Sequence, residues 1–256
     1  MLAIVSCAKK MDFKRELPKL EFSSHTRFYK EAEYLVENLQ KKSALELSQM
    51  MNMSSQLGIL NAERYFQWSW PNHQEMGRAA LYAFTGEVFA SLSGDTLEFD
   101  DLYYSQDSLR IISGLYGLLR PLDLILPYRL EMSTRLKTSK ANDLYGFWRD
   151  KITNALNQDL LSYNHKALVD LASKEYYRAI DSSALSAPVI TPVFKENKNG
   201  KYKTVVLYAK RARGLMARFI IENRLTDPEE IKAFDLEGYH YNNELSKGYQ
   251  YVFTRH

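Results

Sequence analysis

The chain has 256 residues, of which 45% are hydrophobic and 25% are charged. These proportions are ordinary for a globular protein and exclude an intrinsically disordered chain. A single cysteine, Cys7, excludes an internal disulfide and is typical of a reducing compartment. No apolar stretch has the length of a signal-peptide core or of a membrane span, so we expect a cytoplasmic protein that does not bind membranes.

In chain order, the first half alternates short strands with helices. A buried strand is predicted at Leu2–Ser6, and helical spacing follows over Thr26–Lys42. A capping box at Ser43 to Glu46 begins the next helix. A further helix is predicted over Ser55–Trp68, a strand over Ala79–Phe84 and a helical turn over Val88–Leu92.

The second half alternates more regularly. Asn142-Asp143 is predicted to cap a helix to about Leu161, and strands are predicted at Ala167–Leu171 and Val189–Phe194. Asn199-Gly200 predicts a tight turn to a strand over Tyr202–Tyr208. A short helix after Asp227 and strands at Tyr239 and Tyr249–Phe253 close the chain.

No internal repeat, low-complexity tract or Gly/Ser linker divides the sequence. Helices and strands are interleaved irregularly, so the order of predicted elements does not imply a doubly wound parallel sheet. The expectation is therefore one compact domain, residues 1–256, of the α+β class.

Positive charge is concentrated in the segment Lys201 to Arg224, which has seven basic residues and one acidic residue. On a helical wheel, Ala212, Met216 and Ile220 share one face with other apolar residues. The opposite half carries Lys210, Arg211, Arg213, Arg218 and Arg224. Such a face could neutralise phosphates and release their counterions. A merely solvated charged face is the alternative interpretation.

A second basic segment, Arg110 to Lys137, has five basic residues against two acidic ones, whereas the whole chain carries only +3. Concentrated charge of this kind can steer an anionic partner. Within the segment, Gly114 and Gly117 can form a tight turn whose backbone N–H groups face a phosphate. We favour this interpretation because arginines lie nearby, but a strand over Leu109–Ser113 would make the glycines a plain structural turn.

Several strings along the chain are long and unlike the motifs of common folds. They are Ser6-Cys7-Ala8-Lys9, Ser113 to Asp123, Pro127 to Met132, Leu171 to Tyr176, Ala209 to Gly214, and Phe219 to Asn223. Through these strings the chain resembles the YaaA family of peroxide stress resistance proteins over essentially its whole length. One departure is Cys7, where the family opening has proline, so any redox role of this thiol would be private to this protein.

The resemblance implies a compact mixed α+β fold peculiar to the family, a positively charged cleft, a helix-hairpin-helix element and DNA binding that limits iron-driven oxidative damage. We therefore expect a DNA-binding protein, largely without sequence specificity, for duplex or distorted duplex, without cofactor or metal and not primarily an enzyme. Nucleic-acid contacts are predicted for Lys9, Lys10, Gly114, Tyr116, Gly117, Arg120, Arg129, Lys210, Arg211, Arg213 and Arg218. Tyr116, Tyr128 or Tyr208 could stack on an unpaired base.

The alternative is an enzyme that acts on a phosphorylated or nucleotide-like substrate in the same basic cleft. Its predicted pocket draws on Ser6, Lys9, Arg129, Lys174, Glu175, Tyr176 and Lys210. A deep, narrow cavity would favour the enzyme, and an open groove would favour DNA binding. The five histidines lack metal-ligand spacing. Cys7, beside Lys9 and Lys10, is either a thiol with a lowered pKa or a buried cysteine at a strand end.

Overall fold

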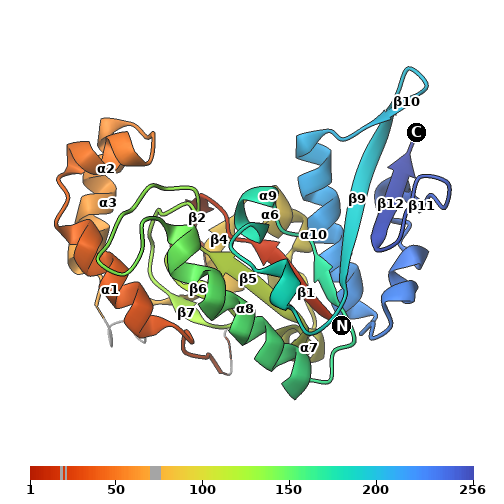
Figure 1. Ribbon diagram of the computed structural model, residues 1–256, viewed down its shortest axis with the longest axis horizontal. Helices are drawn as coiled ribbons and strands as arrows, with labels where there is room; N and C mark the ends of the chain where they lie inside the picture. The colour runs from red at the N-terminus through yellow and green to blue at the C-terminus, as the bar shows by residue number, and fades with distance from the viewer. Residues whose placement is uncertain (18–19, 21, 70–75) are drawn as a thin grey trace.

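The computed structural model describes residues 1–17, 20, 22–69 and 76–256 (Figure 1). Strand β1 (Leu2–Ser6) lies in the middle of the main sheet and pairs in parallel with β5 (Leu109–Ser113) and β8 (Leu168–Asp170). Both β1 and β5 are buried along almost their whole length. Their continuous apolar runs are typical of parallel strands covered on both faces.

The main sheet has eight strands in the order β11-β12-β9-β8-β1-β5-β6, with β10 paired to β9. The remaining strands are β6 (Gly117–Leu119), β9 (Val189–Lys198), β10 (Lys201–Lys203), β11 (His240–Tyr241) and β12 (Gln250–Arg255). The five central strands, from β12 to β5, are mutually parallel, and β6, β10 and β11 pair antiparallel. The chain therefore folds as one compact mixed α/β domain with a mostly parallel sheet, which corrects the α+β expectation.

Helices and short strands surround this sheet. The helices are α1 (Tyr29–Gln40), α2 (Ala44–Met50), α3 (Ser55–Gln67), α5 (Ala80–Ala83), α6 (Glu87–Leu92), α7 (Phe99–Ser108), α8 (Leu144–Ser162), α9 (Lys174–Tyr177) and α10 (Val206–Glu222). Two small ribbons pair β2 (Lys10–Met11) with β4 (Phe84–Thr85) and β3 (Arg78–Ala79) with β7 (Leu124–Ile125). Short 3-10 turns lie at Gly94–Thr96, Ser182–Ala184, Pro228–Ala233 and Leu236–Gly238.

Helix α10 is the element that brings the basic C-terminal segment to the sheet. It packs on α6, α7, β9 and β1, whereas α8 lies across the front of the sheet in Figure 1. Its residues Ala212, Met216 and Ile220 are buried, which confirms the predicted amphipathic helix. A Cβ at Gly214 would lie 2.1 Å from the Val88 carbonyl oxygen, so this glycine permits the close approach of α10 and α6.

Several local signals in the sequence are confirmed. Ser43 and Glu46 form the capping box of α2, and the Asp143 side chain accepts a hydrogen bond from the Gly146 amide at the start of α8. Asn199 and Gly200 both have positive φ and connect β9 to β10, which pair antiparallel as a hairpin. In each case the turn or cap depends on a few adjacent residues.

Two predicted strands are wrong in extent. Residues 79–84 form the end of β3, the helical turn α5 and the start of β4, and all are buried. A short apolar run buried on all sides has no polar face to reveal its period. Strand β10 ends at Lys203, and α10 begins at Val206 rather than after Tyr208.

The predicted helix-hairpin-helix element is wrong as well. Gly114 lies in the turn between the antiparallel strands β5 and β6, and Gly117 is the first residue of β6. In the turn, the Ser113 hydroxyl accepts hydrogen bonds from the Leu115 and Tyr116 amides. The glycines and Tyr116 are buried, so they cannot contact DNA. The alternative interpretation, a strand followed by a structural turn, is the correct one.

Candidate functional site

The site lies where β1 and β8 end. The two strands are parallel neighbours, so their carboxyl ends meet at the same edge, which is where open sheets usually bind ligands. Ser6 ends β1, and Ser173 follows β8. The Ser6 hydroxyl accepts a hydrogen bond from the Ser173 amide at 2.8 Å and donates one to the Ser173 hydroxyl at 3.3 Å. The hydroxyl proton of Ser173 therefore has no acceptor in the described part of the chain.

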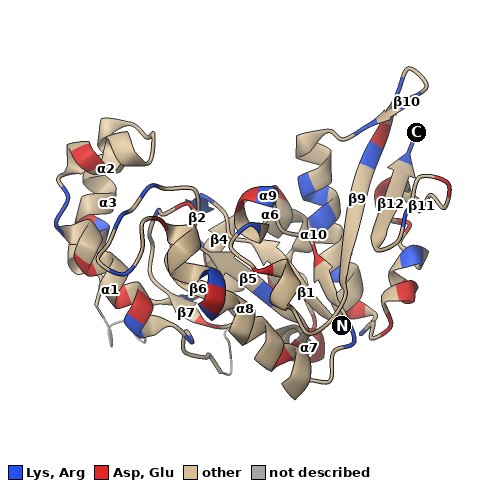
Figure 2. Cartoon of the chain, viewed as in Figure 1, with Lys and Arg blue, Asp and Glu red and all other residues tan. Residues whose placement is uncertain are grey.

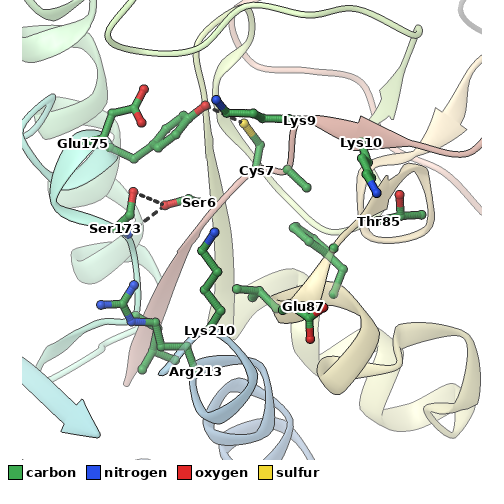
Figure 3. A pocket seen from close by; sticks show the side chains of 16 residues that line it. Ser6, Cys7, Lys9, Lys10, Thr85, Glu87, Ser173, Glu175, Lys210 and Arg213 are labelled. Carbon is green, nitrogen blue, oxygen red and sulfur yellow. Dashed lines mark hydrogen bonds between the residues drawn. The ribbon is translucent and has the colours of Figure 1, made fainter. Parts of the chain in front are cut away.

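A pocket of about 430 Å³ opens beside this serine pair (Figure 3). Its charged lining residues are Lys9, Lys10, Glu87, Glu175, Lys210 and Arg213. Its apolar lining includes Ala8, Val88, Phe89, Leu171 and the ring of Tyr176. The pairing of Lys10 with Thr85 in the β2–β4 ribbon brings the start of α6 into the wall. Segments from both ends of the chain thus form one site.

Two cations reach the serine pair from α10. Lys210 and Arg213 extend from the first half of the helix toward Ser6 and Ser173, as Figure 3 shows. Arg213 is half-buried, and within the described residues its guanidinium has neither a hydrogen-bond acceptor nor a carboxylate within 4.0 Å. Burial lowers its pKa, and the charge of Asp170 opposes that effect. A half-buried guanidinium that has no acceptor among the described residues is a strong binding group for an anion.

Asp170, at the end of β8, is the electrostatic neighbour of Arg213. Burial raises the pKa of its carboxyl to about 7, although the Ala172 amide and the charge of Arg213 act in the other direction. The Ala172 amide donates a hydrogen bond to this carboxyl at 2.9 Å. Asp170 is therefore partly protonated near neutral pH and neutralises Arg213 only in part.

The lysines of the pocket differ in their partners. Lys9 forms an ion pair of 2.5 Å with Glu131. Lys10 and Lys210 are exposed, and among the described side chains no carboxylate lies within 4.0 Å of either. Burial alone would raise the pKa of Glu131, yet hydrogen bonds from Lys9 and Arg129 lower it overall. Lys10 and Lys210 thus carry the charge that is most accessible to a ligand.

The thiol of Cys7 also faces the pocket. Its sulfur donates a hydrogen bond to the Tyr176 hydroxyl at 3.3 Å. Desolvation by the surrounding atoms disfavours the thiolate and raises the pKa of the thiol to about 11. The interpretation of Cys7 as a thiol with a lowered pKa is therefore wrong. The thiol is protonated at neutral pH, when its nucleophilicity is low.

The structure brings only some of the predicted nucleic-acid residues together. Lys9, Lys10, Lys210 and Arg213 line the pocket. The other predicted arginines lie outside it and have carboxylate partners: Arg120 with Asp123, Arg129 with Glu131, Arg211 with Glu237, and Arg218 with Glu222. Figure 2 shows carboxylates interspersed with cations over most elements.

Other parts of the two basic segments are likewise unsuited to bind phosphate. Arg110 is 1% exposed, and its Nε donates to Asp159 at 2.7 Å, so it belongs to the core. Of the tyrosines proposed to stack on a base, Tyr116 and Tyr128 are buried. Tyr208 is 39% exposed, with the Arg255 guanidinium over its ring.

The pocket contains five of the seven residues proposed for a phosphorylated substrate: Ser6, Lys9, Glu175, Tyr176 and Lys210. Lys174 is exposed and lies outside the lining, as does Arg129. The Glu175 carboxylate accepts hydrogen bonds from the amide and hydroxyl of Ser133, at 3.0 and 2.8 Å.

The sequence reasoning missed Ser173 as a site residue, Asp170, and the wall formed by Thr85, Glu87 and Phe89. The position of Asp170 near the end of the strand predicted over Ala167–Leu171 was the available signal. No sequence signal indicated that residues 85–89 line the pocket, because their position depends on the pairing of β2 with β4.

No described helix is long and apolar enough to cross a membrane. The described His, Cys, Asp and Glu side chains form no group of three or more that could hold a metal ion.

Comparison with known proteins places the chain in a family. The sequence profile of the family described as "Peroxide stress protein YaaA" matches residues 1–245. The chain is 48% identical over 255 residues to a UPF0246 protein of Hahella chejuensis and 44% identical over 255 residues to one of Saccharophagus degradans. Each match covers 100% of this chain and 99% of the relative. The chain therefore belongs to the YaaA family of peroxide stress proteins.

Proposed function

We propose that this YaaA family member is a cytoplasmic protein that binds DNA, largely without sequence specificity, and that this binding protects the DNA against peroxide. One observation carries the proposal. Lys9 and Lys10, next to β1, and Lys210 and Arg213, on α10, line the same pocket although almost the whole chain separates them. The family description supports the role in peroxide stress.

The available charge favours contacts to the DNA backbone. Lys10 and Lys210 are exposed and lack carboxylate partners within the described residues, so a phosphate would not have to displace an existing ion pair. A lysine ammonium acts as a flexible point charge on phosphate. Contacts to phosphate position a protein on DNA but carry no sequence information.

The pocket also limits how DNA could approach. A volume of about 430 Å³ is that of a small-molecule site, not of a groove for a double helix, and on this criterion alone the pocket favours the alternative, an enzyme acting on a phosphorylated or nucleotide-like substrate. A duplex would therefore lie across the mouth, where the exposed lysines reach its phosphates. The buried Arg110, Gly114 and Gly117 play no part in this arrangement.

The test is a titration of a fluorescent duplex with wild-type protein and with Lys10→Glu/Lys210→Glu. Since two phosphate contacts become repulsive, we expect the affinity to fall on the order of tenfold or more at low salt. The measurement is the dissociation constant from fluorescence anisotropy.

The matched control is Lys41→Glu/Lys166→Glu. Both lysines are exposed and have no carboxylate within 4.0 Å in the described chain. Lys166 precedes β8 and so lies at the opposite edge of the sheet. The control should retain most of the affinity. If both double variants lose affinity equally, binding depends on overall charge and the proposal is wrong.

A further inference from the structure

We propose that the pocket is a binding site for a single nucleotide unit, with the phosphate at the serine pair and the base against the apolar wall. This inference rests on the DNA-binding function proposed above and specifies what enters the pocket. It follows from three features of the lining: donors without an acceptor in the described chain that point to one place, an apolar wall, and a mixture of cations and carboxylates.

The phosphate end is defined by donors that lack acceptors. The half-buried Arg213 guanidinium has no hydrogen-bond acceptor among the described residues, and the Ser173 proton has none assigned. Lys210 points to the same place from α10 (Figure 3). Donors that point to one place and have no acceptor in the described chain are available to an anionic ligand, and a guanidinium or ammonium binds it through charge-assisted hydrogen bonds.

The lining also includes apolar side chains, of which Leu171 and Tyr176 flank Ser173 in the chain. Phe89 and Tyr176 are each 6% exposed, and Leu171 is 1% exposed, yet all three contribute to the pocket wall. Inorganic phosphate has no apolar surface to place against this wall. A nucleobase would cover it, since aromatic side chains stack on any base.

Charge and size also fit one nucleotide. Four cations and two carboxylates line the pocket, and Glu131, outside the lining, pairs with Lys9, so an excess of positive charge remains for an anionic phosphate. Glu87 and Glu175 are acceptors for sugar hydroxyls or base amino groups. The volume of about 430 Å³ lies within the range of small-ligand sites.

The first test compares AMP, adenosine and inorganic phosphate by isothermal titration calorimetry with the wild-type protein. We expect AMP to bind at least tenfold tighter than either fragment, because only AMP uses both ends of the pocket. If AMP binds no tighter than inorganic phosphate, the inference is overturned. Undiminished duplex binding in that case would leave the proposed DNA binding intact.

The second test uses two arginines of α10. Arg213→Gln removes the guanidinium in the pocket and should weaken AMP binding at least tenfold. Arg211→Gln is the control, since Arg211 is exposed, pairs with Glu237 at 2.8 Å and lies outside the pocket. It should change AMP binding less than twofold. Equal losses, or no loss in Arg213→Gln, would contradict the inference. The first test needs no variant and stands if Arg213→Gln does not fold.

The nucleotide can come from solution or from a DNA strand, and duplexes distinguish the two sources. If it comes from DNA, a duplex with one unpaired nucleotide should bind more tightly than a fully paired one, and AMP should abolish the difference. If it is a free nucleotide, the two duplexes should bind equally while AMP binding persists. If the wild-type protein binds AMP but neither duplex, the proposed DNA function is refuted and the nucleotide site is supported.

Discussion

At the scale of single residues, the pKa of Cys7 is determined by the groups that surround the thiol in space, not by its neighbours in the sequence. Lys9 and Lys10 follow it closely in sequence, but Lys9 pairs with Glu131 and Lys10 belongs to the β2 ribbon. The thiol instead meets Tyr176, and burial raises its pKa to about 11. Adjacent charge in a sequence therefore did not predict a reactive thiol here.

The reactivity of Cys7 can be measured directly because it is the only cysteine. With a pKa of about 11, the thiolate fraction at pH 7.5 is about a hundredfold lower than for an ordinary thiol. Iodoacetamide labelling should therefore be at least tenfold slower than for glutathione and should speed up with pH until about pH 11. Urea-unfolded protein is the control, and labelling of the folded protein at the rate of glutathione would contradict this assignment.

Asp170 and Arg213 illustrate a limit of sequence reasoning at the same scale. Their electrostatic interaction joins the end of β8 to the middle of α10. Nothing in the local sequence of either residue indicates the other. Each has an ordinary surface interpretation until the parallel sheet and the packing of α10 on β1 bring them together.

At the scale of elements, the β5–β6 hairpin shows why long identifiable strings need not be binding sites. A Cβ at Gly114 would lie 2.2 Å from the Leu130 carbonyl oxygen, and one at Gly117 would lie 2.5 Å from the Trp148 ring. Gly117 also has a φ of +68°. These glycines are required by close packing and by backbone conformation.

This packing role predicts the effect of Gly114→Ala. Because backbone atoms must move to admit the methyl group, we expect the free energy of unfolding to fall by about 2–4 kcal/mol in urea denaturation. Gly146→Ala in α8 is the control, since its Cβ would lie 3.5 Å from Asp143 in ordinary contact. It should change stability by less than about 1 kcal/mol. A Gly114→Ala variant as stable as this control would contradict the packing role.

Elements with their own local signals were predictable from the sequence. Capping by Ser43 and Asp143, the Asn199-Gly200 turn and the amphipathic α10 depend on neighbouring residues, and all are confirmed. The 79–84 segment was not, because complete burial hides the difference between strand and helix. The mostly parallel sheet was also missed, since pairing between distant strands leaves no local pattern.

At the scale of the whole molecule, much of the positive charge counted in the two basic sequence segments is not available to a ligand in the folded protein. Arg110 is in the core, and Arg120, Arg129, Arg211 and Arg218 have carboxylate partners. The carboxylates that pair with Arg120 and Arg129 are buried, and all four ion pairs reduce the positive field of these segments. The available positive charge that remains around the pocket comes from Lys10, Lys210 and Arg213.

The candidate site was therefore predictable in composition but not in geometry. The strings that contain Ser6, Lys9, Glu175 and Lys210 were identified, and these residues do line one pocket. The contribution of α6 depends on contacts between distant segments, which spacing in a sequence cannot reveal.

The central claim is that cations from the β1–β2 region and from α10 contact the same DNA. The most direct measurement is the salt dependence of duplex binding for Lys10→Gln, Lys210→Gln and the double variant. The slope of log affinity against log salt should decrease by about one for each single variant and by about two for the double variant. If either single variant keeps the wild-type slope, that segment does not contact DNA and the claim is wrong.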